Sequence, residues 1–98
     1  MNSSEAIATL KRSEQALRKR GVMHATLFGS VARGINTAES DIDILIEIDP
    51  DVRMTVFDYV DLKDYIAGLF DEPVDVVHRG ALKTYIRSAA TADALYAF

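Results

Sequence analysis

The chain has 98 residues, of which 49% are hydrophobic and 27% charged, a composition typical of a globular domain. This length predicts a single domain over residues 1–98, too small to include a separate substrate domain. The chain has no cysteine, no apolar run of about 18 residues and no basic segment leading into an apolar one. Disulfides, thiolate metal sites and a membrane-spanning helix are therefore excluded, and a cytoplasmic protein is expected.

The net charge of −4 is distributed unevenly. Residues 39–75 contain twelve acidic side chains and only two basic ones, whereas the rest of the chain has nine basic and three acidic side chains. A nucleic-acid-binding protein normally presents an uninterrupted basic face, so the acidic middle argues against direct nucleic-acid binding. The basic flanks suit phosphates or an acidic partner.

Residues 4–20 are predicted to form the first helix. Its apolar stripe consists of Ile7, Leu10 and Leu17. Ser3 or Ser4 can cap the N-terminus, and Gly21 suits the C-terminal end. The basic triplet 18–20 is either a solvated helix end, which complements the helix dipole, or a contact with a partner.

A short apolar strand is predicted over residues 23–28. His24 has no second histidine to join it and is interpreted as a packed or surface residue. Gly29 permits a tight exit from the strand, and the helical turn expected from Ser30 would aim free N–H groups at an anion. Arg33 lies one turn further on, where its guanidinium could meet a phosphate.

The second strand is predicted from residue 41, where acidic or apolar residues at odd positions alternate with isoleucines at even positions. Asp41 and Asp43 therefore share a face, with α-carbons about 6.6 Å apart. They form either a plain exposed polar face or a site for Mg²⁺, which takes one or two protein carboxylates and leaves its other positions to water and phosphates. Ser40 could orient Asp41 or reach a phosphate through its hydroxyl.

A second long helix is predicted over residues 55–70, with Thr55 as its cap. The expected buried stripe consists of Val56, Tyr59, Leu62, Ile66 and Leu69 or Phe70. Three aspartates, Asp58, Asp61 and Asp64, occupy the exposed side, where they form a solvated face or attract a basic partner.

Residues 73–78 are predicted to form a third strand in which Asp75 lies among valines. A carboxylate with apolar neighbours should face a cation or a polar cleft, unless it lies at an exposed edge.

Residues 81–97 are expected to form a closing helix, or a helix followed by an irregular tail. Its basic stripe, Arg79, Lys83 and Arg87, could reach phosphates or a partner, or be solvated. Together these elements predict an α/β or α+β fold with a mixed three-stranded sheet and helices packed against it.

Gly29-Ser30, a ten-residue gap and Asp41-Ile42-Asp43 resemble the signature of the DNA polymerase beta-like nucleotidyltransferase superfamily. The whole chain resembles the minimal nucleotidyltransferase (MNT) branch, whose members are antitoxins paired with HEPN-type ribonuclease toxins. Val31 departs from the pattern, because relatives can have arginine there.

The resemblance implies the nucleotidyltransferase fold and a role for each motif residue. Asp75 occupies the place of the family's third acid, so Asp41, Asp43 and Asp75 would be both catalytic residues and Mg²⁺ ligands. The nucleotide would be bound by Gly29, Ser30, Arg33 and Ser40.

The implied activity is transfer of AMP from Mg-ATP to a tyrosine hydroxyl of a cognate HEPN ribonuclease toxin, which neutralises the toxin. Two alternatives remain open at this point. The chain could be a non-catalytic antitoxin that neutralises the toxin by binding and occlusion. It could also be a nucleotidyltransferase that acts on a small molecule or on RNA.

Overall fold

The computed structural model describes residues 2–29, 34, 41–78 and 95–98. In chain order, the elements are α1 (Ser3–Arg12), α2 (Glu14–Lys19), β1 (Val22–Phe28), β2 (Ile42–Ile48), α4 (Val56–Ala67), β3 (Val74–His78) and β4 (Leu95–Tyr96). The predicted mixed α+β fold is confirmed. No helix of the described residues is long and apolar enough to cross a membrane.

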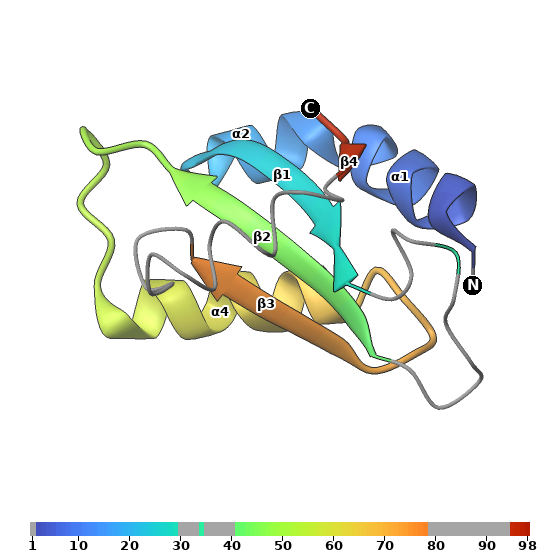
Figure 1. The fold of residues 1–98 in the computed structure, drawn as a ribbon. Helices are drawn as coiled ribbons and strands as arrows, with labels where there is room; N and C mark the ends of the chain where they lie inside the picture. The colour runs from blue at the N-terminus through green and yellow to red at the C-terminus, as the bar shows by residue number, and fades with distance from the viewer. Residues whose placement is uncertain (1, 30–33, 35–40, 79–94) are drawn as a thin grey trace.

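The sheet has four strands in the order β3-β2-β1-β4, rather than the three that the sequence predicts (Figure 1). β2 is antiparallel to β1 and parallel to β3, so the predicted mixed pairing is confirmed. The added strand is β4, which pairs antiparallel with Thr26 and Leu27 of β1. Of the two predictions for residues 81–97, a helix that continues through residue 97 is wrong, because Leu95 and Tyr96 pair with the edge of β1 in an extended conformation. The rest of the helix predicted for residues 81–97 lies outside the described residues.

Two helices occupy the stretch predicted as one helix. α1 ends at Arg12, and α2 begins at Glu14. Ser13 lies between the two helices, and its N–H donates to the carbonyl of Leu10 at 3.1 Å. The cap of α1 is Asn2 rather than Ser3 or Ser4, because its Oδ1 accepts from the Glu5 N–H at 2.8 Å. Gly21 follows α2 with φ +99°, as expected of a residue that ends a helix.

The core lies between the helices and one face of the sheet. Figure 1 shows α1, α2 and α4 on the same side of the strands. The fully buried side chains include Leu10, Leu17, Leu27, Ile42, Ile44, Ile46, Leu62 and Ile66. Strand residues alternate between faces, so the isoleucines of β2 point toward the helices while Asp43, Leu45 and Glu47 point to the opposite face.

α4 begins at a capping box, as the sequence predicts from Thr55. The Thr55 hydroxyl accepts from the Asp58 N–H at 3.1 Å, and the Asp58 carboxylate accepts from the Thr55 N–H at 3.1 Å. Leu62 and Ile66 are buried as predicted, but Val56 is 76% exposed and does not belong to the buried stripe. Val56 lies about 80–120° around the helix from Ile66 and Leu62, which places it to the side of the buried stripe.

Candidate active site

The sheet register brings two of the three predicted acids side by side. β2 and β3 are parallel neighbours, and Asp43 is the register partner of Asp75. Adjacent strands lie about 4.8 Å apart, and register partners share a face of the sheet. Asp43 and Asp75 therefore project from neighbouring positions on the face away from the helices.

Asp41 is exposed and immediately precedes β2, two residues from Asp43. The backbone is tied to β3 at this point, because the Ile42 N–H donates to the Pro73 carbonyl at 2.9 Å. The three acids thus come from the start of β2 and the start of β3, which lie together at one end of the sheet.

The three carboxylates are electrostatically coupled. Burial raises the pKa of the Asp43 carboxyl above its ordinary value, and the negative charges of Asp75 and Asp41 raise that pKa further. This negative charge favours a bound cation, because a cation relieves the repulsion among the carboxylates.

Gly29, at the end of β1, lies in close contact with one of the three acids. Its φ is +76°, and a Cβ placed on it would collide with Oδ2 of Asp43 and lie 3.1 Å from Cγ of Asp43. Only glycine lets the backbone approach the carboxylate this closely without strain. The sequence predicts a tight exit from the strand here, but not that the exit touches Asp43. Of the other predicted nucleotide-binding residues, Ser30, Arg33 and Ser40 all lie outside the described residues.

The carboxylates could supply part of the coordination of a Mg²⁺ ion, with water and phosphate oxygens supplying the rest. Within residues 2–29, 34, 41–78 and 95–98, no group of three or more His, Cys, Asp or Glu side chains is arranged to hold a metal ion. Mg²⁺ usually takes one or two protein carboxylates and completes its octahedron with water and phosphate oxygens. Asp43 with its register partner Asp75 fits that requirement, and the raised pKa of Asp43 indicates the negative charge that a divalent cation would neutralise.

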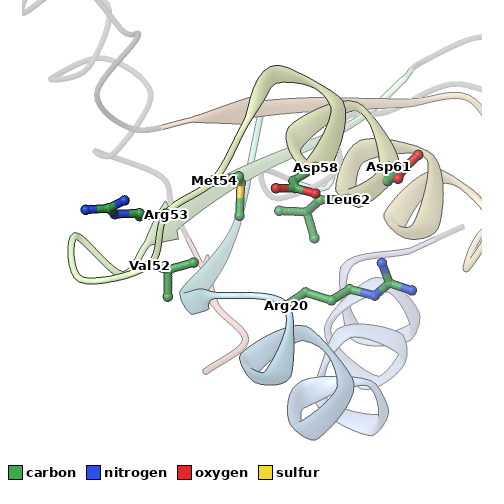
Figure 2. Close-up of a pocket in the computed structure, with 7 residues that line it drawn as sticks. All are labelled: Arg20, Val52, Arg53, Met54, Asp58, Asp61 and Leu62. Carbon is green, nitrogen blue, oxygen red and sulfur yellow. The ribbon is translucent and has the colours of Figure 1, made fainter.

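A cavity of about 180 Å³ lies elsewhere, between the end of α2, the loop after β2 and the start of α4 (Figure 2). Its lining consists of Arg20, Val52, Arg53, Met54, Asp58, Asp61 and Leu62. The predicted site residues that the structure describes, Gly29, Asp41, Asp43 and Asp75, are not part of this lining. Val52 and Met54 follow the C-terminal end of β2, whereas Asp43 is near its N-terminal end, so this cavity is separate from the acids.

Fold and site together define a small α+β domain with helices on one side of a mixed sheet and coupled carboxylates on the other. The nucleotidyltransferase domain family matches residues 10–97 of the chain. A protein of Thermococcus cleftensis named protein adenylyltransferase MntA is 32% identical over 93 residues, which cover 94% of this chain and 90% of that protein. The chain belongs to the nucleotidyltransferase domain family.

Two solved structures share the fold. A toxin–antitoxin crystal structure with AMP-PNP contains a chain with a TM-score of 0.69 and 21% identity, covering 90% of this chain and 72% of that one. A structure of the tri-AMPylated HEPN toxin of Shewanella oneidensis in complex with MNT antitoxin contains a chain with a TM-score of 0.64 and 18% identity. That match covers 94% of this chain and 71% of the other.

Proposed function

We propose that this chain is an antitoxin that transfers AMP from Mg-ATP to a tyrosine hydroxyl of a cognate HEPN ribonuclease toxin and so silences the toxin. The observation that carries the proposal is the register pair of Asp43 and Asp75, with the Gly29 backbone against the Asp43 carboxylate. The Thermococcus relative supports protein adenylylation, and the two toxin–antitoxin structures support the nucleotide and the HEPN partner. The proposal includes a cytoplasmic location, with which the absence of cysteine agrees.

The reaction is an in-line displacement at the α-phosphorus of ATP. The tyrosine oxygen forms a bond to that phosphorus, the bond to the β-phosphate oxygen breaks, and pyrophosphate leaves. Asp75 accepts the proton of the attacking hydroxyl or orients that hydroxyl for attack. Asp43, together with its strand neighbour Asp41 or its register partner Asp75, would hold Mg²⁺, and the bound Mg²⁺ would supply charge neutralisation at the triphosphate.

The phosphates of ATP would be bound by the residues that follow β1 and by Ser40. Backbone N–H groups after Gly29 and the Ser30 hydroxyl would donate to phosphate oxygens, and Arg33 would add a charge-assisted bond. Ser40 would orient Asp41 or bind a phosphate. In these assignments, the segment from Gly29 to Arg33 binds the phosphates of the nucleotide, whereas the acids bind Mg²⁺.

The direct test is AMP transfer in a purified system. The chain, α-labelled ATP, Mg²⁺ and the HEPN-type protein encoded beside it are expected to give a labelled HEPN protein and pyrophosphate. Mass spectrometry is expected to place AMP on tyrosine. Asp43→Asn should abolish the label while leaving the chain folded, as measured by circular dichroism. Label that persists in Asp43→Asn, or no label with folded wild-type chain, would overturn the transferase proposal.

Occlusion without catalysis is a second candidate, favoured by the exposed apolar side chains of α4. The double variant Asp41→Asn with Asp43→Asn separates the two. Under adenylylation it forms the complex but no longer protects cells from the toxin. Under occlusion it protects as well as the wild-type chain does.

A further inference from the structure

The outward side of α4 exposes a short apolar stripe near its start. Phe57 is 83% exposed and Val60 is 48% exposed, and the two are neighbours on the helix surface because they lie three residues apart. Val56, which is 76% exposed, lies one turn before Val60. These three residues are here called the α4 patch. Leu62 and Ile66 supply the buried face of the same helix, so the patch is apolar surface in addition to the core.

Exposed charges of opposite sign lie beyond the two ends of the α4 patch. Arg53 is four residues before Phe57, in the loop that leads into α4, and Asp64 is four residues after Val60. Within the part of the chain that the structure describes, neither side chain makes an ion pair. Figure 2 shows that Arg53 points away from the other residues that line the cavity. The patch therefore has a basic end and an acidic end.

The neighbouring charges are engaged within the chain itself. The guanidinium carbon of Arg20 lies 4.2 Å from the centroid of the Tyr65 ring, and the Nζ of Lys63 lies 5.6 Å from the centroid of the Tyr59 ring. Asp61 lines the cavity of Figure 2 together with Arg20, so the two opposite charges lie near each other. This leaves Arg53 and Asp64 as the charges at the ends of the patch that another molecule can pair with.

A second copy of α4, packed antiparallel, complements the apolar centre and both charged ends. With a twofold axis midway between Phe57 and Val60, Phe57 of each copy packs against Val60 of the other. The residue four positions after Val60 then lies opposite the residue four positions before Phe57, so Asp64 of each copy meets Arg53 of the other. Parallel packing about a twofold axis would instead place each charge beside its own counterpart, and like charges repel.

We propose that the α4 patch is the interface of a homodimer, in which two α4 helices pack antiparallel and two Arg53–Asp64 ion pairs close the ends. This inference does not depend on the proposed function. The helices lie on one side of the sheet, and Asp43 and Asp75 project from the other side, so both copies keep their acids accessible (Figure 1). The patch is much smaller than a standard interface, which makes the dimer weak and dependent on concentration.

Sedimentation equilibrium of the purified chain from about 10 μM to about 1 mM measures the dimer. The wild-type chain should change from monomer to dimer over this range. Phe57→Asp should weaken dimerisation by about a hundredfold, because the interface contains this ring twice. Tyr96→Asp is the matched control, since Tyr96 is also an exposed aromatic residue, at 64%, but lies on β4. It should dimerise as the wild-type chain does, and circular dichroism checks that both variants fold.

The antiparallel arrangement is tested by reversing one charge at a time. Arg53→Asp and Asp64→Arg should each weaken self-association by about tenfold, because each puts like charges at both ends of the interface. An equimolar mixture of the two variants should form a heterodimer of wild-type affinity, because every end then has opposite charges. A mixture that associates no better than the separate variants would overturn the antiparallel pairing.

The remaining outcomes identify other occupants of the patch. A wild-type chain that stays monomeric up to about 1 mM would overturn the inference, as would a dimer that Phe57→Asp leaves intact. If the wild-type chain is monomeric and Phe57→Asp binds the HEPN-type protein more weakly, the toxin covers the patch and the homodimer is wrong. Failure of AMP transfer by a dimeric chain would contradict the proposed function alone.

Discussion

Gly29 is the residue at which the two parts of the nucleotidyltransferase signature meet in space. The sequence separates Gly29-Ser30 from the aspartates by about ten residues, yet the backbone of Gly29 lies against the side chain of Asp43. The close contact follows from the antiparallel pairing of Phe28 with Asp43, which puts the end of β1 beside the start of β2. The signature thus marks a contact between neighbouring strands.

We predict that Gly29→Ala destabilises the chain by about 1–3 kcal/mol and abolishes AMP transfer, because it adds a collision with Asp43 to the strain of a left-handed backbone. Gly34→Ala is the matched control, since Gly34 has φ +73° but no atom within 4 Å of an added Cβ. It should incur only the backbone strain of about 1–2 kcal/mol. Urea denaturation measures both variants. Equal losses of stability would show that the contact with Asp43 has no effect.

The carboxyl of Asp43 gives a prediction about pH. Its pKa in the folded chain is raised above 3.8, so the folded state holds this proton more tightly than the unfolded state does. The resulting stability is complete below about pH 3.8 and is lost as the pH rises through the folded-state pKa. Without metal at pH 7, Asp43→Asn should therefore raise the melting temperature of the folded chain.

Thermal denaturation of the wild-type chain and of Asp43→Asn in EDTA, between about pH 3 and pH 7, tests this dependence of stability on pH. The gain from Asp43→Asn should shrink toward zero as the pH falls below 3.8, and Mg-ATP should stabilise the wild-type chain more than the variant. A variant that is less stable than the wild-type chain at pH 7 in EDTA would show that the charge of Asp43 is compensated by groups other than a cation.

At the scale of the elements, the strands that form the site could be predicted and some boundaries could not. The alternation in β2 and the valines of β3 are strong local signals, which is why the Asp43 and Asp75 strands were predictable. The break between α1 and α2 at Ser13 could not be predicted, because no proline or glycine lies there and the apolar spacing continues across it from Leu10 to Leu17. β4 has only two residues, too few for periodicity, and depends on the edge of β1.

Two N-cap residues, Thr55 of α4 and Ser13 of α2, give a matched pair of predictions. Thr55→Ala removes the hydroxyl that accepts from the Asp58 N–H and should cost about 1 kcal/mol of unfolding free energy. Ser13 occupies the N-cap of α2 without a side-chain hydrogen bond to that helix, so Ser13→Ala should change stability by less than about 0.5 kcal/mol. Chemical denaturation compares them. A loss at Ser13 as large as that at Thr55 would contradict the role of the capping box.

The whole molecule separates its chemistry from its exposed apolar surface. Asp43 and Asp75 project from the face of the sheet away from the helices, and the exposed apolar side chains Val56, Phe57 and Val60 belong to the helix layer. The sequence could predict that acids share a face, because strand alternation and the signature both indicate it. It could not predict that Val56 is exposed, because a valine at the start of an amphipathic helix fits the core stripe equally well until the phase of the helix is fixed by packing.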